Sequence, residues 1–135
     1  MKRMAFRVVD HVLVLIHAAE DPSDDEWALY LKEIKRQGTN LLPQIVVTEG
    51  GRPNLLQRKL LTDVLAGRVV KVAVLSDQTM VRGVVTAISW FNRDIKAFSG
   101  NNLMGAMTYL DVPDRLFRVI QSVTTGLRDE LKRAA

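Results

Sequence analysis

Residues 70–98 constrain the fold of this chain more than any other stretch. A short apolar run, residues 70–75, stops at the turn-forming Ser76-Asp77. The apolar residues that follow recur at helical spacing, which puts them on one face of a helix; they are Val81, Val84, Val85, Ile88 and Phe91. A second short run, residues 95–98, comes after another turn-forming sequence. A strand, a helix and a strand in this order predict two parallel strands joined by a right-handed crossover.

The N-terminal segment predicts the beginning of the same sheet. Two β-branched runs, residues 5–9 and 12–17, flank Asp10-His11 and predict an antiparallel hairpin. The second run is almost continuously apolar. We therefore expect it to be a central strand that is covered on both faces.

Two further helices are expected between this hairpin and residue 70. The first begins at Ser23, because Glu26 three residues later completes a capping box, and it ends at Gly38. Its expected buried stripe is Trp27, Tyr30, Leu31 and Ile34. The second follows a strand that begins at Gln44, and it starts after Asn54. Its expected buried stripe is Leu56, Leu60, Leu61 and Val64.

The whole chain predicts the element order β-β-α-β-α-β-α-β-α-α. A short helix is expected over residues 103–110 and a last one over 113–132. This order indicates an α/β fold with a mixed, mostly parallel sheet of four or five strands, crossover helices and an extra C-terminal helix. We expect residues 1–112 to form the α/β domain and residues 113–135 to form the C-terminal helix.

The composition narrows the class of protein. The chain has 135 residues, 47% hydrophobic and 25% charged, which is typical of one globular domain. It has no cysteine, which excludes disulfides and thiolate metal sites and is compatible with a cytoplasmic location. No apolar run approaches the roughly 18 residues of a membrane span, and no convincing signal-peptide cleavage site follows the basic start. The net charge is +4, but the basic residues are scattered, so nucleic-acid binding is not expected.

Three segments carry a resemblance to a known family: residues 72–77 (VAVLSD), residues 95–98 (IKAF) and residues 103–110, which end in Tyr109-Leu110. They resemble the STAS-like superfamily of anti-sigma-factor antagonists and sulfate-transporter C-terminal domains, in particular its SpoIIAA-like branch, which often has Trp-Leu in place of Tyr109-Leu110. The resemblance implies a bacterial, non-enzymatic regulatory module that binds a partner protein. Some related domains are thought to bind nucleotides or lipids, so a small-molecule, nucleotide or lipid-binding module is the alternative.

The resemblance also bears on regulation. The best-known members carry a phosphorylatable serine at the start of the second helix. The matching segment here, residues 48–54, reads TEGGRPN and has no serine. Thr48 falls at the end of the predicted strand and not at the helix start. We therefore expect partner binding without a serine phosphoswitch.

Two turns carry the candidate residues for binding a partner or an anion. They are Gly50, Gly51, Arg52 and Asn54 in the first turn, and Ser76, Asp77, Thr79 and Arg82 in the second. Glycine permits close backbone approach, and helix starts attract anions. Because successive parallel strands place such turns at one sheet edge, we expect Arg52 and Arg82 to share a shallow basic site. The simpler interpretation is structural: a Gly-Gly turn, and an N-cap from Asp77 or Thr79.

No residue group indicates catalysis. His11 and His17 are the only histidines, and the sequence assigns no acid partner to either. The patterns GxSxG, HExxH and GxGxxG are absent. We therefore predict no catalytic residue, no metal site and no cofactor. Trp90 is expected to pack in the core or at a helix–sheet seam, in preference to an exposed interaction patch.

The last helix carries an apolar seam at helical spacing. Its members are Leu116, Ile120, Val123, Leu127 and Leu131. The family core does not include this helix, and a single domain can cover its sheet without it. We expect the seam to pack on a second copy and give a homodimer. Packing of the seam on the sheet of its own chain is the alternative.

Overall fold

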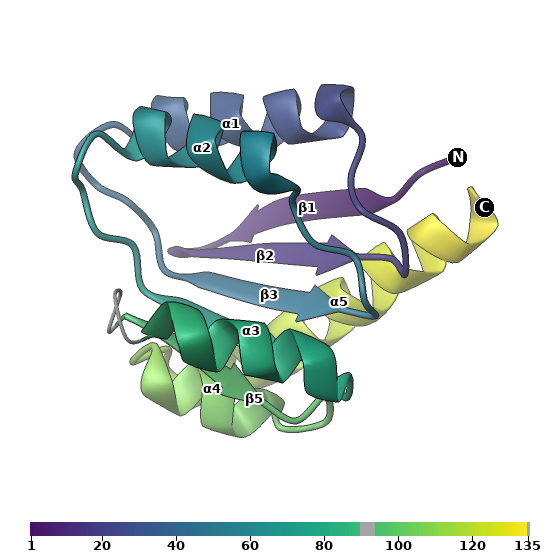
Figure 1. Ribbon diagram of the computed structural model, residues 1–135. Helices are drawn as coiled ribbons and strands as arrows, with labels where there is room; N and C mark the ends of the chain where they lie inside the picture. The colour runs from purple at the N-terminus through teal and green to yellow at the C-terminus, as the bar shows by residue number, and fades with distance from the viewer. Residues whose placement is uncertain (90–93, 135) are drawn as a thin grey trace.

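The computed structural model describes residues 1–89 and 94–134, with side chains given for all of these except 87–89 (Figure 1). The expectations for Trp90, for Phe91 and for the side chain of Ile88 fall outside this part of the chain. Within it, the order of strands and helices agrees with the sequence prediction. A short 3-10 turn, Asp114–Leu116, precedes the last helix.

The five strands form one mixed sheet in the order β1-β2-β3-β4-β5. Their bounds are β1 Met4–Val9, β2 Val12–His17, β3 Gln44–Thr48, β4 Val72–Leu75 and β5 Ile95–Phe98. The hairpin pair β1–β2 is antiparallel, and the other three pairs are parallel. Every residue of β2 is buried, which confirms the expectation that this strand lies inside the sheet and is covered on both faces.

Helices cover both faces of the sheet. On one face lie α1 (Asp24–Gln37), α2 (Leu55–Leu65) and α3 (Thr79–Ser89), and on the other lie α4 (Leu103–Tyr109) and α5 (Phe117–Arg133) (Figure 1). The alternation of side chains along β2 divides the core in the same way. Leu13 and Leu15 pack with α1, whereas Val14 and Ile16 pack with α4 and α5. Among the described helices, none is long and apolar enough to cross a membrane.

The predicted buried stripe of α2 is wrong at two positions. Leu56 and Leu60 are exposed, at 63% and 43%, and the fully buried residue on this helix is Gln57, at 1%. The cause lies at the helix start, where Asn54 and Gln57 form a capping box. The Gln57 side chain also donates to the Pro22 carbonyl, and the indole N–H of Trp27 donates to the Gln57 carbonyl, 2.8 Å away. Because these bonds turn Gln57 inward, Leu56 must point outward.

The C-terminal seam packs on the sheet of its own chain, which is the alternative that the sequence left open. Leu116, Ile120, Leu127 and Leu131 are buried in the same core as β1 and β2, and Val123 packs against them partly buried. The physical reason is that β2 is apolar on both faces, while α4 has only seven residues and cannot cover its face of the hairpin. The α5 helix fills that place, so it shares one core with the strands of the α/β domain.

Candidate functional site

The glycine turn after β3 is held by hydrogen bonds within the chain. The Gly50 N–H donates to Thr48 Oγ1 at 3.1 Å, and the Gly51 N–H donates to the Ala18 carbonyl at 2.9 Å. A Cβ at Gly51 would lie 2.5 Å from that same carbonyl oxygen, so only glycine fits. These N–H groups are therefore already used, and the structural interpretation accounts for Gly50 and Gly51.

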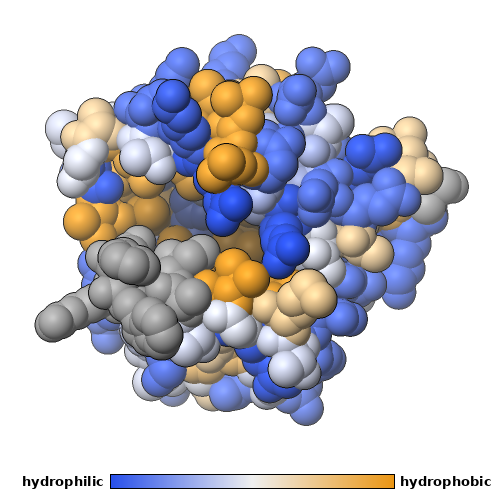
Figure 2. Space-filling model, in the orientation of Figure 1, coloured by the Kyte–Doolittle hydropathy of each residue, from blue (hydrophilic) through white to orange (hydrophobic). Residues whose placement is uncertain are grey.

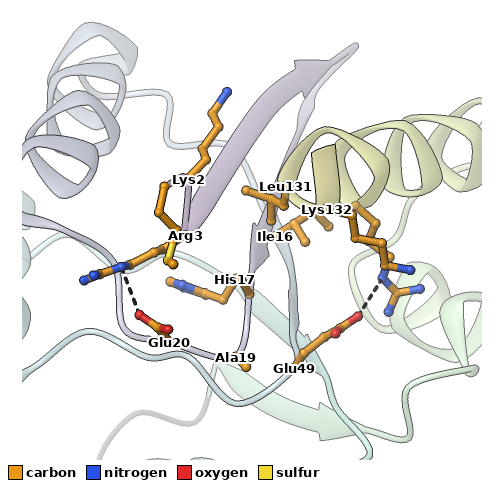
Figure 3. Close-up of a pocket in the computed structure, with 12 residues that line it drawn as sticks. Lys2, Arg3, Ile16, His17, Ala19, Glu20, Glu49, Leu131 and Lys132 are labelled. Atoms are coloured by element: carbon orange, nitrogen blue, oxygen red, sulfur yellow. Dashed lines mark ion pairs between the residues drawn. The ribbon is translucent and has the colours of Figure 1, made fainter. Parts of the chain in front are cut away.

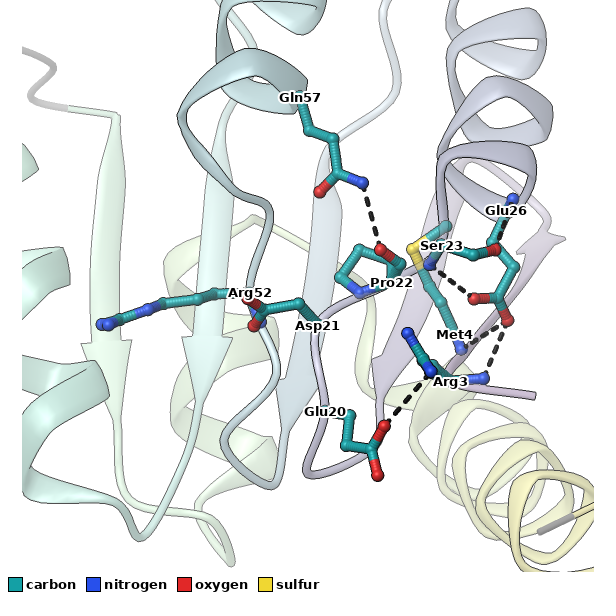
Figure 4. Close-up of polar contacts among 9 residues, drawn as sticks. All are labelled: Arg3, Met4, Glu20, Asp21, Pro22, Ser23, Glu26, Arg52 and Gln57. Atoms are coloured by element: carbon teal, nitrogen blue, oxygen red, sulfur yellow. Dashed lines mark hydrogen bonds and ion pairs between the residues drawn. The ribbon is translucent and has the colours of Figure 1, made fainter. Parts of the chain in front are cut away.

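Arg52 is placed differently from its two neighbours. Its backbone N–H donates to Asp21 Oδ1 at 3.0 Å, while its residue surface is exposed. Figure 4 shows its side chain pointing away from the polar contacts around Ser23 and Glu26. The Asn54 side chain is used in the capping box of α2, where its Oδ1 accepts the Gln57 N–H at 2.8 Å. Of the first candidate turn, Arg52 therefore presents the free charged group.

The turn after β4 is also largely structural. Ser76 is buried, and its Oγ accepts the Gln78 N–H at 3.0 Å. Asp77 Oδ1 accepts the Gly100 N–H at 2.9 Å, which ties this turn to the segment after β5. Thr79 begins α3, and Arg82 lies one turn later and is half-buried. Its Nε has no hydrogen-bond partner within the part of the chain that the structure describes.

The two turns do meet at the carboxyl edge of the sheet, as expected. They line one pocket of about 200 Å³, with Thr48 and Glu49 from the first turn and Ser76, Asp77 and Gln78 from the second. Neither Arg52 nor Arg82 lines it. The cation there is Arg128 of α5, whose Nε lies 3.8 Å from Glu49 Oε1. No sequence signal marked Arg128, because its place depends on how α5 docks on the sheet.

A second pocket of about 220 Å³ lies next to the first and shares Glu49 and Arg128 with it (Figure 3). His17, the last residue of β2, lines this pocket and is only 3% exposed. Burial lowers the pKa of His17 to about 4, against the smaller opposing effects of Asp21 and Glu26. Its imidazole is therefore neutral at pH 7. His11, in contrast, is exposed at the opposite end of β2, so the two histidines do not form one site.

The outer surface of α2 carries exposed apolar side chains, two of which, Leu56 and Leu60, the sequence prediction placed inside. Leu55, Leu56 and Leu60 are exposed there, and Met80 is exposed at the start of α3. Figure 2 shows hydrophobic side chains gathered over α2 and over α3, with hydrophilic atoms between them. We call Leu55, Leu56, Leu60 and Met80, together with Arg52, the α2–α3 surface.

Across the described residues, no group of three or more His, Cys, Asp or Glu side chains could hold a metal ion. Comparison of the chain with protein-family models, with curated proteins and with solved structures gives no match.

Proposed function

We propose that this chain is a non-enzymatic interaction module of the STAS-like, SpoIIAA-like kind, which binds a partner protein through the α2–α3 surface. The observation that carries the proposal is the exposure of Leu55, Leu56 and Leu60 on one helix. Scattered single apolar residues on a surface are ordinary. Leu56 and Leu60 are four residues apart and lie side by side on the helix, and neighbouring exposed apolar side chains bordered by charge are typical of an interaction site. The resemblance further suggests a bacterial, cytoplasmic protein.

The charges around these leucines favour an acidic partner. Lys59 follows Leu55 by four residues, so the two lie side by side on the helix, and Arg58 is exposed next to it. Arg52 adds a third cation immediately before the helix. An amphipathic segment with apolar anchors and acidic flanks would match this arrangement.

The hydrogen bonds of Thr48 support binding without a phosphoswitch. Its hydroxyl is buried, donates to the Gly51 carbonyl at 2.6 Å and accepts the Gly50 N–H. A kinase would have to open this turn to reach the oxygen. We therefore propose that the partner complex does not depend on phosphorylation in residues 48–54.

Site-directed photocrosslinking tests the surface. A photoreactive residue at position 56 should capture a specific partner from the source cell, whereas one at Leu29 of α1, a leucine of similar exposure (61%), should not. Excess unlabelled protein should compete for the capture. The double substitution Leu56→Ser and Leu60→Ser should not compete.

The role of charge is tested with Arg52→Ala. This substitution keeps the backbone bond to Asp21 and should leave the melting temperature unchanged. It should weaken the partner complex by roughly 1–3 kcal/mol, as for a lost charge-assisted hydrogen bond. If Leu56→Ser with Leu60→Ser competes as well as the unmodified protein, the α2–α3 surface is not the interface. The small-molecule alternative has a different location, the pocket beside His17.

A further inference from the structure

The pocket beside His17 contains a buried polar group for which the described residues supply no partner. His17 Nδ1 is buried and makes no hydrogen bond among the described residues, although the imidazole lines the pocket. Arg128 Nε is in the same situation, since its ion-pair contact with Glu49, at 3.8 Å, is too long for a hydrogen bond. Buried polar atoms in folded proteins nearly always have partners, so these two atoms on one pocket are groups that a bound ligand could satisfy.

The charges that line the pocket set the charge of that ligand. Four cationic side chains line it, Lys2, Arg3, Arg128 and Lys132, against the two carboxylates of Glu20 and Glu49, which leaves a side-chain charge of +2 when His17 is neutral. Three of these cations have acidic partners. Arg3 pairs with Glu20 at 3.2 Å, Arg128 with Glu49, and Lys2 with Glu130 at 2.8 Å outside the pocket. Lys132 has no ion pair among the described residues, so it is the uncompensated cationic side chain of the lining.

The apolar lining residues and the volume of the pocket indicate the size of the apolar part of the ligand. Ile16 and Leu131 offer apolar side chains, and Figure 3 shows both beside His17 on the side away from Glu20. The volume of about 220 Å³ is larger than a cavity of about 150 Å³ that accepts benzene, and smaller than the about 300 Å³ at which pockets for drug-sized molecules begin. One ring or a short alkyl chain would fill it.

We propose that this pocket binds a small monocarboxylic acid whose apolar body lies against Ile16 and Leu131. Its carboxylate pairs with the Lys132 ammonium and competes with Glu49 for the Arg128 guanidinium. A guanidinium is planar and can donate two parallel hydrogen bonds to one carboxylate. The neutral imidazole of His17 provides a further polar contact. This site is separate from the α2–α3 surface, and neither proposal depends on the other.

Titration with benzoate, followed by NMR of the histidine rings, tests the assignment. The chain has only two histidines, so the exposed His11 is an internal reference for the buried His17. We expect the His17 ring resonances to shift saturably at benzoate concentrations up to about 10 mM, while those of His11 stay in place. Benzyl alcohol, which has the same ring and no charge, should cause no such shift.

Substitutions on α5 provide the matched comparison. Arg128→Gln and Lys132→Gln should each weaken benzoate binding about tenfold or more, as expected for a lost charge-assisted contact. Arg118→Gln, which removes a cation from the exposed side of the same helix, should leave it unchanged. The proposal is overturned if benzoate gives no saturable shift, if benzyl alcohol binds equally well, or if inorganic phosphate alone occupies the site. Leu56→Ser with Leu60→Ser should not affect benzoate binding, so the failure of one proposal is distinct from the failure of the other.

Discussion

Two neighbouring residues at the start of α2 test which face of this helix is buried. Gln57 is 1% exposed and Leu56 is 63% exposed, the reverse of what their polarity suggests. The Gln57 side chain makes three hydrogen bonds: it donates to the Pro22 carbonyl at 3.0 Å and to Asp24 Oδ1 at 3.0 Å, and it accepts the Asn54 N–H at 2.9 Å. Figure 4 shows the first of these bonds, which joins α2 to the loop before α1.

The substitution Gln57→Leu removes all three bonds and leaves the Pro22 carbonyl without this donor. At about 1 kcal/mol for each bond the loss is about 3 kcal/mol, and the additional apolar burial of leucine returns about 1 kcal/mol. We therefore expect the free energy of unfolding to fall by about 2 kcal/mol. The matched substitution Leu56→Gln changes an exposed side chain and should stay within about 0.5 kcal/mol of the unmodified protein.

Urea denaturation, monitored by circular dichroism, measures both changes, because a single domain of this size is expected to unfold in one transition. The midpoint should move clearly for Gln57→Leu and barely for Leu56→Gln, with unchanged slopes. If Leu56→Gln is the more destabilising of the two, α2 buries Leu56, as its sequence pattern predicts, and Gln57 is not the buried residue.

Two further predictions concern the glycines and the pH dependence of stability. Gly51→Ala should lower the melting temperature, because its Cβ would lie 2.5 Å from the Ala18 carbonyl oxygen. Gly126→Ala in α5 has open space around it and should raise the stability by about 0.5–1 kcal/mol. Thermal melts compare the two variants, and equal effects would contradict the close approach at Gly51. Because the pKa of His17 is lowered to about 4 in the folded chain, from 6.5, the unfolded chain binds the proton more readily, and stability should fall as the pH drops from 6.5 to 4, by up to about 3 kcal/mol. Denaturation across this range should show that loss for the unmodified protein and a smaller one for His17→Gln; equal slopes would mean that His17 is not buried as a neutral group.

Local signals in the sequence determined most of the elements of this fold. The capping box of Ser23 and Glu26, the stop at Gly38 and the start of β3 at Gln44 all occur where the sequence predicts them. The apolar run of residues 12–17 identified the buried strand. These features depend on a residue and its near neighbours along the chain, through helix caps, side-chain period and turn residues, so they can be read without knowing the fold.

The candidate sites depended on contacts between residues far apart in the sequence. Whether α2 buries Leu56 or Gln57 depends on the carbonyl of Pro22, 35 residues away from Gln57. The apolar seam of α5 could have faced either its own sheet or a second copy, and the short α4 left the face of β2 for it to cover. That docking brings Arg128 beside Glu49 and encloses His17. Periodicity along a helix shows which residues share a face, but only the tertiary structure decides what that face meets, because burial depends on the surfaces that remain uncovered elsewhere in the fold.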